Sequence, residues 1–165
     1  MHKKLLSILG TIALIGTSTT SLVACNTPQE YTKEQLAKLK EENKINTTNQ
    51  QIRDNLEWIT PQEKPFKNID DKWYYVVWRG DKNDNWRIIK FKHFEQKEKV
   101  LDNYDKYELK TSHFGGDLFI YKNLFVSYDW NKDDGTYFKS VYRWNLDTNI
   151  SDLLNIDENG NIKVK

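Results

Sequence analysis

The chain has 165 residues, a length typical of a single domain with a short extension. Lysine and arginine total 25 and aspartate and glutamate 24, so the net charge of +1 excludes a strongly basic nucleic-acid binder that works by bulk charge. A single cysteine, Cys25, excludes an intrachain disulfide and a cysteine-based zinc cluster. Six Trp, nine Tyr and seven Phe indicate a folded domain rather than a disordered polar chain.

The N-terminus has the three parts of a secretory signal peptide. Lys3 and Lys4 form a positive start, an apolar run covers residues 5–16, and small residues lead to Ala24. The apolar run breaks into Ser and Thr before it reaches the roughly 20 residues that a membrane-spanning helix needs. We therefore predict a signal peptide over residues 1–24 and regard a retained signal anchor as the alternative.

The end of this leader, Leu22-Val23-Ala24-Cys25, resembles the lipobox of bacterial lipoproteins. The resemblance implies lipidation of Cys25 and cleavage after Ala24; the alternative is an incidental cysteine at an ordinary cleavage site. The leader, which begins Lys-Lys-Leu-Leu and ends Val-Ala-Cys-Asn, is similar to those of mollicute (spiroplasma-type) lipoproteins. That similarity implies a location and no activity: a cell membrane, reached through lipid on Cys25, with the protein on its extracellular face. Residues 25–30 would be the lipidated cysteine and its tether.

Residues 31–61 have a helical pattern in two parts. Thr32 and Gln35 have the spacing of a capping box, and Thr48 with Gln51 repeats it. The first part, residues 31–43, has few strong apolar contacts, which predicts a solvated spacer. The second part carries an amphipathic stripe that ends at Pro61 and consists of Ile52, Leu56 and Ile59.

After Pro65 the pattern changes to strands. We predict seven of them, at residues 73–79, 86–92, 104–110, 117–122, 124–130, 136–144 and 162–164. Turn signals separate them, and Asn159-Gly160 is the strongest hairpin signal. Because the connections are too short for crossover helices, the sheet should be antiparallel. We expect a mainly β domain over residues 66–165, an antiparallel meander or a small sandwich or barrel, preceded by one or two short helices.

Two of these strands predict how the sheet is covered. The strand at 73–79 is apolar on both faces and so requires cover on both, with the helix around Ile52 as the nearest candidate for one cover. The strand at 124–130 alternates, with Leu124, Val126, Tyr128 and Trp130 on one face, which predicts a half-buried strand.

Three of the four arginines are next to a tryptophan: Arg79, Arg87 and Arg143. Adjacent strand residues point to opposite faces, so these arginines could share one face while the tryptophans are buried. Such a face would suit carboxylate, phosphate or sulfate groups through bidentate contacts. The alternative is ordinary solvated arginines that pair with the many acidic residues.

No motif assigns a catalytic, cofactor-binding or metal-binding residue. His93 and His113 lack an identifiable third metal ligand. The segment 129–135 has the acidic spacing of a calcium loop but has Asp134 and Ser140 where that loop requires Gly and Glu, so it is better interpreted as a polar turn. Paired carboxylates for glycoside hydrolysis stay open, because nothing singles out one pair.

We therefore expect a membrane-anchored surface lipoprotein that acts as a non-catalytic binding module, with a host-surface or glycan ligand and no nucleic acid. The alternatives are a small surface hydrolase and a surface protein derived from a phage or mobile element. An exposed apolar or aromatic patch would favour binding, whereas a cleft with converging acidic groups of shifted pKa would favour an enzyme.

Overall fold

The computed structural model describes residue 28 and residues 30–112 and 116–165. Within these ranges the fold is mainly β, with antiparallel sheets that do not close into a barrel. The helices are α1 (Lys33–Glu42), α2 (Gln50–Asn55) and the short 3-10 turns η1 (Pro61–Glu63), η2 (Trp130–Lys132) and η3 (Ser151–Leu153). The strands are β1 (Leu56–Trp58), β2 (Trp73–Trp78), β3 (Arg87–Lys92), β4 (Lys99–Tyr104), β5 (Tyr107–Thr111), β6 (Leu118–Lys122), β7 (Phe125–Asp129), β8 (Phe138–Trp144), β9 (Leu154–Ile156) and β10 (Ile162–Val164).

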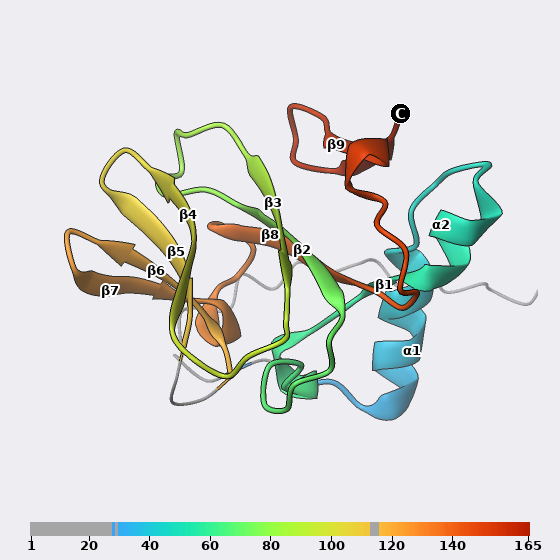
Figure 1. Cartoon of the computed structure of the whole chain (residues 1–165), viewed down its shortest axis with the longest axis horizontal. Helices are drawn as coiled ribbons and strands as arrows, with labels where there is room; N and C mark the ends of the chain where they lie inside the picture. Colours follow the sequence, from blue (N-terminus) through green and yellow to red (C-terminus); the bar gives the residue numbers. More distant parts are fainter. Residues whose placement is uncertain (1–27, 29, 113–115) are drawn as a thin grey trace, which may run out of the picture.

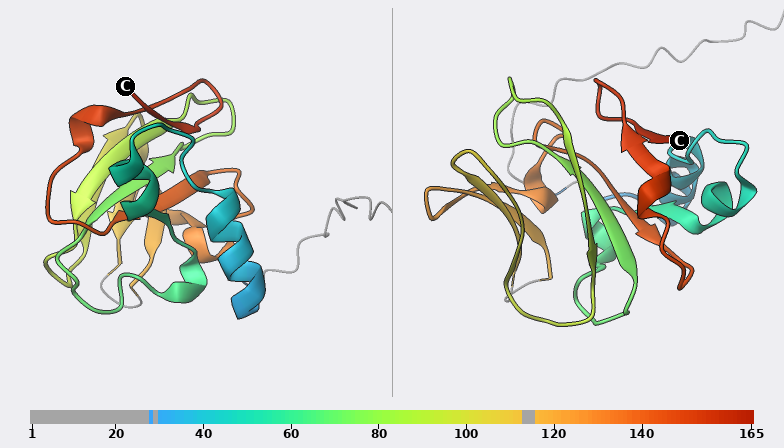
Figure 2. Two further views of the ribbon diagram at one scale, coloured as in Figure 1. Left: turned by 90° about the vertical axis from the view of Figure 1, so that its right-hand side faces the viewer. Right: turned by 45° about the horizontal axis from the view of Figure 1, so that its top comes forward.

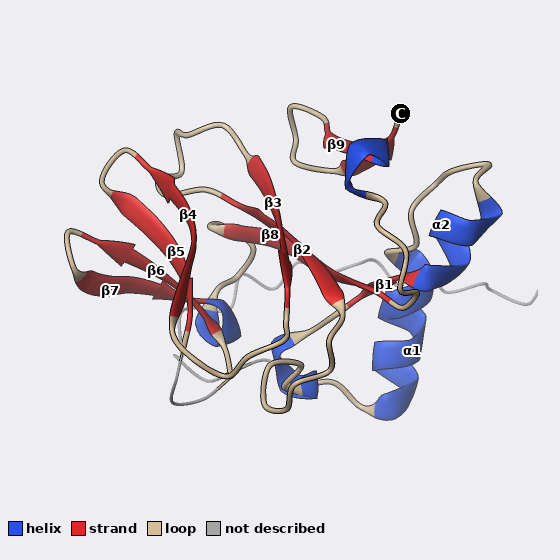
Figure 3. Cartoon of the chain, in the orientation of Figure 1, coloured by secondary structure: helices blue, strands red, loops and turns tan. Residues whose placement is uncertain are grey.

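The elements form three layers (Figures 1 and 2). The first sheet has the strand order β1-β8-β2-β3, and the second is a meander in the order β4-β5-β6-β7. The two sheets face each other across one apolar core, and a second core lies on the other face of the first sheet. Helices α1 and α2, the turn η3 and the β9–β10 hairpin lie on that side of the molecule, as the colouring in Figure 3 shows.

Strand β2 is buried on both faces, which confirms the prediction from its sequence. Tyr74, Val76 and Trp78 point into the core between the sheets, whereas Tyr75 and Val77 point into the second core. The second core is completed by residues from both ends of the chain: Ile45, Ile52 and Leu56 on one side and Tyr142, Trp144, Ile150, Leu154 and Ile162 on the other. The prediction that the segment around Ile52 covers this strand is therefore also confirmed.

The boundaries of that segment differ from the prediction. Helix α2 begins after Asn49, whose side chain accepts a hydrogen bond from the Ile52 N–H, and it ends at Asn55. Leu56 to Trp58 then pair with β8 as an edge strand, so that Ile59 lies in the core between the sheets. The unpaired edge of β8 supplies backbone partners for these residues, and this tertiary pairing overrides the helical periodicity. By contrast, α1 begins with the predicted capping box of Thr32 and Gln35 and buries no residue, as expected of a solvated helix.

Strands β4 and β9 were not expected from the sequence. β4 is an edge strand with a bulge between Val100 and Asp102, so its backbone is held by pairing with β5 while most of its side chains stay polar. β9 pairs with β10 at the predicted Asn159-Gly160 turn, but the loop is longer than two residues because the Asp157 carboxylate accepts hydrogen bonds from backbone N–H groups at 159 and 161.

The second sheet has two distinct ends, because β6 connects to β5 at one and to β7 at the other. The chain enters the domain beside the β5–β6 end: the Tyr31 N–H donates to Gln62 Oε1 at 2.7 Å, and Gln62 Nε2 donates to the Tyr31 carbonyl at 3.0 Å. Gln62 belongs to η1, and η1 contacts η2 at the same end. At the opposite end the β6–β7 turn is joined to the β4–β5 turn by a 3.2 Å hydrogen bond from the Asn123 N–H to the Lys106 carbonyl.

Candidate functional site

The structure does not bring the three arginines together on one exposed face. Arg87 pairs in register with Trp78, and Arg143 with Tyr74, so both lie on the side of the first sheet that faces the second sheet. The Arg79 guanidinium instead lies over the ring of Trp86, 4.2 Å from its centroid, and Trp86 packs on the other core. The adjacent tryptophans therefore do not place the arginines in a common orientation, because Arg79 lies beyond the end of β2.

Each arginine is also held by its own partners. Arg87 binds the Asp102 carboxylate in a bidentate manner, at 2.9 and 3.0 Å, and Arg79 donates to the Thr136 carbonyl at 2.7 Å. Arg143 donates to Glu57 at 2.7 Å, and Lys40 binds the same carboxylate. Burial would raise the pKa of Glu57, but hydrogen bonds from Lys40, Arg143 and Asn145 outweigh it and hold the pKa below its ordinary value. These arginines stabilise the fold and leave no shared anion-binding face.

The most exposed apolar residues are found at the β6–β7 turn. We call residues 123–126 the hairpin tip. Leu124 is 83 % exposed, Phe125 77 % and Val126 53 %. The prediction that Leu124 and Val126 lie on the buried face of this strand is wrong, because β7 has a bulge: Tyr128 opposes Ile120, whereas Val126 opposes Tyr121, so Val126 points to the outer face.

The backbone of the hairpin tip is strained at Leu124. Lys122 pairs with Phe125, which leaves a two-residue turn, and both turn residues have positive φ, 49° at Asn123 and 75° at Leu124. Such turns favour Asn-Gly, because only Gly adopts the second conformation without steric cost. Leucine at this position therefore costs stability through its φ angle and gains nothing from burial. Strained backbone and exposed apolar surface are both more frequent at functional sites than elsewhere, which makes the hairpin tip a candidate interaction site.

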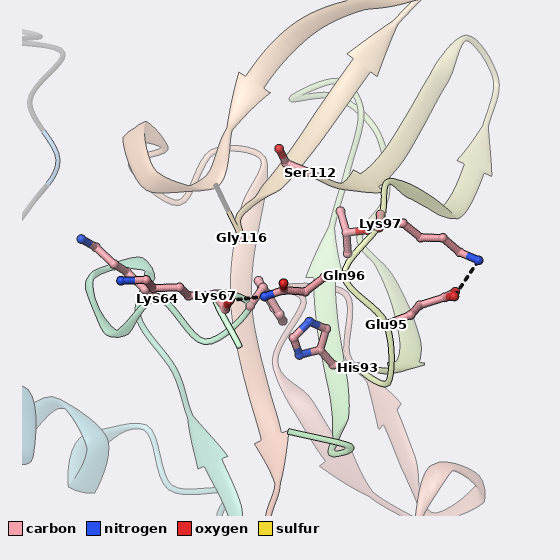
Figure 4. Close-up of a pocket in the computed structure, with 10 residues that line it drawn as sticks. Lys64, Lys67, His93, Glu95, Gln96, Lys97, Ser112 and Gly116 are labelled. Atoms are coloured by element: carbon pink, nitrogen blue, oxygen red, sulfur yellow. Dashed lines mark hydrogen bonds and ion pairs between the residues drawn. The ribbon is translucent and has the colours of Figure 1, made fainter. Parts of the chain in front are cut away.

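A second feature, which we call the basal cavity, lies at the β5–β6 end of the sheet. It has a volume of about 340 Å³ and is lined by Lys64, Phe66, Lys67, His93, Glu95, Gln96, Lys97, Thr111, Ser112 and Gly116 (Figure 4). The lining residues come from the segment after η1, the segment after β3 and the two ends of the β5–β6 connection. No sequence motif pointed to this cavity, because its residues are scattered over loops that only the packing of the two sheets brings together.

Charge in the basal cavity is mainly positive. Lys97 pairs with Glu95 at 2.6 Å at the rim, and the Gln96 amide donates to the Lys67 carbonyl (Figure 4). Lys64 and Lys67 have no acidic partner among the residues that the structure describes. Both side chains are exposed and extend away from His93 (Figure 4), so their ammonium groups lie on the outer side of the cavity.

His93 forms one wall of the basal cavity and is only 4 % exposed. Its Nδ1 lies 3.4 Å from Asp70 Oδ1 without a hydrogen bond, and the rings of Phe66 and Tyr74 pack edge-on against it. The other ring nitrogen points toward Gln96 and the interior of the cavity, whereas the hydroxyl of Ser112 points away from His93 (Figure 4). The inner ring nitrogen of His93 thus faces the cavity. Ser112 and His93 do not form the serine–histidine pair that a serine hydrolase requires. His113 lies outside the described residues.

One carboxylate pair has a strongly shifted pKa. Burial, together with the neighbouring Asp129 carboxylate, raises the pKa of Asp117 to about 7. Asp129 also accepts a 3.0 Å hydrogen bond from the Asn131 N–H and lies 3.7 Å from Lys132. Neither carboxylate lines the basal cavity, and within the described ranges no group of three His, Cys, Asp or Glu residues could hold a metal ion. Residues 129–135, which have the acidic spacing of a calcium loop, form a polar turn: the Asp133 carboxylate accepts hydrogen bonds from the backbone N–H groups of residues 135, 137 and 138.

The fold and these surfaces define a two-sheet β protein with an apolar tip at one end and a basic cavity at the other. Comparison with protein families, with curated proteins and with solved structures finds no match to this chain. None of the helices in the described part of the chain is long and apolar enough to span a membrane.

Proposed function

We propose that this protein is a lipid-anchored binding module on the extracellular face of a cell membrane, and that it holds a protein partner through the hairpin tip. The observation that carries the proposal is the exposure of Leu124 and Phe125 on a strained turn. These two side chains are the most exposed of the large apolar residues in the described part of the chain, and exposed apolar groups mark interaction sites. Phe125 supplies a single ring, whereas Leu124 and Val126 offer neither a ring nor a hydrogen bond to a sugar, so this mainly aliphatic tip suits an apolar protein surface better than a glycan.

The geometry of the domain agrees with attachment at Cys25. Only residues 26–30 separate Cys25 from Tyr31, and six extended residues span at most about 20 Å. Tyr31 is held against η1 at the β5–β6 end of the second sheet, whereas the hairpin tip lies at the opposite end of β6. A domain anchored through this tether would therefore present the tip to the outside. The resemblance of the leader to mollicute lipoproteins supports the same arrangement.

The proposal is tested by photo-crosslinking on intact cells. A photoreactive leucine analogue is placed at position 124 of the full chain, and the matched control carries it at Leu153, which is also exposed, at 41 %, but lies in η3 on the other side of the first sheet. We expect a discrete protein adduct from position 124 and none from position 153. Equal labelling from both positions, or no adduct from position 124, would overturn the proposal.

A further inference from the structure

Helix α1 is held to the rest of the domain by few apolar contacts. None of its residues is buried, and its half-buried side chains, Leu36, Leu39 and Lys40, follow the spacing of a single helix face. In Figures 1 and 2 the helix lies at the margin of the domain. Apolar packing therefore holds α1 less firmly than α2, whose Ile52 is fully buried.

Two polar links attach α1 instead. Lys40 binds the carboxylate of Glu57 in β1 and, at 2.6 Å, that of Glu63 in η1. At the other end of the helix, the Tyr31 backbone and the Gln62 side chain exchange hydrogen bonds of 2.7 and 3.0 Å. The three charged side chains are 24 %, 26 % and 23 % exposed. Ion pairs that water reaches contribute little net stability and are weakened by salt.

Neither carboxylate would lose its last partner if the lysine of α1 moved away. Glu57 also accepts hydrogen bonds from Arg143 at 2.7 Å and from Asn145 at 3.2 Å. Glu63 accepts a 2.8 Å hydrogen bond from the Thr60 N–H. Separation of α1 from the domain therefore avoids the large cost of leaving a buried charge unpaired.

The chain is fixed to the domain directly after α1. The carbonyl of Asn43, the C-cap residue, accepts a 2.9 Å hydrogen bond from the Tyr142 hydroxyl. Two residues later, Ile45 is buried in the second core. The segment before Asn43 is thus free to move once its two polar links open. We propose that α1 is a releasable spacer, which undocks from the domain about a pivot at Asn43.

Undocking lengthens the connection between the predicted lipid site and the domain. In the docked state only residues 26–30 separate Cys25 from Tyr31, and they span at most about 20 Å. After release the free connection runs from Cys25 to Asn43 and spans up to about 60 Å when extended. A ten-residue helix is marginally stable by itself in water, so the released segment can extend. This gain in reach rests on the proposed anchoring, whereas undocking depends only on the contacts of α1.

Pulsed electron paramagnetic resonance tests undocking in the full chain, kept in a neutral detergent. Spin labels are placed at Lys33→Cys, at the start of α1, and at Lys139→Cys, an exposed position in β8, in a Cys25→Ser background that removes the natural thiol. We expect a narrow docked distance and a broad undocked distribution. The undocked fraction should grow about three-fold between about 20 mM and about 500 mM salt, because the ion pairs of Lys40 are screened.

Two lysine variants of this labelled chain separate the ion pairs from general charge effects. Lys40→Gln should raise the undocked fraction about three-fold at low salt and abolish its salt dependence. The matched control, Lys38→Gln, removes the same charge from the same helix and should leave the fraction unchanged, because this lysine is 78 % exposed and pairs with Glu42 of α1 itself. A single narrow distribution at both salt concentrations, or an undocked fraction that responds equally to both variants or to neither, overturns the proposal. Since the labelled chain cannot be lipidated at position 25, the result is independent of the anchoring and of the crosslinking experiment at Leu124.

Discussion

Leu124 is a residue whose backbone conformation and exposure both act against the stability of the fold. Its φ of 75° costs about 1–2 kcal/mol in a residue with a Cβ, and its 83 % exposure returns little of that by burial. The turn does not require this strain, because glycine adopts the same conformation without it. The fold therefore tolerates an unfavourable residue at this exposed turn position.

We expect Leu124→Gly to leave the free energy of unfolding unchanged or to raise it, within about 1 kcal/mol, because relief of the backbone strain is partly offset by the entropy of glycine in the unfolded chain. Urea denaturation followed by tryptophan fluorescence measures this change. The control is Asn123→Gly, at a φ of 49°, which should be close to neutral since asparagine tolerates this conformation. A loss above 1 kcal/mol at position 124 would show that the leucine packs against the domain.

Asp117 should make the free energy of unfolding fall as the pH rises, whereas most aspartates make it rise. Its pKa in the folded protein is raised from 3.8 to about 7, so the folded state binds a proton more tightly than the unfolded state. Stability from this group is therefore present below about pH 4 and is lost as the pH rises to about 7. Asp117→Asn should remove that slope and stabilise the protein at pH 8 by on the order of 2 kcal/mol.

Denaturation of both proteins at pH 4.5 and pH 8 measures this effect. Asp134 is the control, because it is exposed and hydrogen bonds from Thr136 lower its pKa, so that Asp134→Asn should lose rather than gain stability at pH 8. An Asp117→Asn variant with the pH dependence of the parent would contradict the raised pKa of Asp117.

Among the elements, β2 contributes to both apolar cores, and α2 covers one of its faces. Ile52 in α2 is fully buried in the second core and contacts the face of β2 that presents Tyr75 and Val77. Since α2 has only six residues, packing rather than helix propensity holds it in place.

Replacing Ile52 by Ala should lower the free energy of unfolding by about 2–5 kcal/mol through lost burial and a residual cavity. Ile69→Ala deletes the same atoms from a residue that is 53 % exposed and should cost less than about 1 kcal/mol. Chemical denaturation of the pair measures the difference. Equal losses at the two positions would mean that α2 does not cover the sheet.

At the level of elements, strands with strong alternation or double-sided apolar character were predictable, and β2, β3, β5, β6, β7, β8 and β10 all lie close to their expected positions. β1, β4 and β9 were not, because each is a short or polar edge strand whose formation depends on the backbone of a neighbour rather than on its own pattern. The bulge in β7 escaped prediction for the same reason, and it decides which residues of that strand are exposed.

For the whole molecule, the anchor is the feature that the sequence predicts most specifically, and it is open to a direct test. A fatty-acid analogue should label the protein in cells, and Cys25→Ser should abolish both the label and the cleavage after Ala24. Metabolic labelling followed by mass spectrometry of the N-terminus measures both. Ser21→Ala, four residues earlier, is the control and should leave processing intact. A Cys25→Ser protein that is still cleaved and labelled would contradict the lipoprotein interpretation.

The candidate binding surfaces were less predictable than the fold. The tryptophan neighbours of the arginines suggested a shared face, but Arg79 lies past the end of β2 and the other two are paired with Asp102 and Glu57. The basal cavity depends on loops brought together by packing, and the hairpin tip depends on a bulge. Such features arise from three-dimensional placement, which local sequence patterns do not encode.

The second core has a consequence for the order in which the protein can fold. Its residues come from both ends of the domain, and the pairing of Leu56 with Trp144 closes the first sheet across most of the chain. As the chain is synthesised, its N-terminal half therefore cannot complete this core until the last strands have been made. Contacts of such long sequence separation also fold slowly. The second core is thus completed only when β9 and β10 are available to pack against the first sheet.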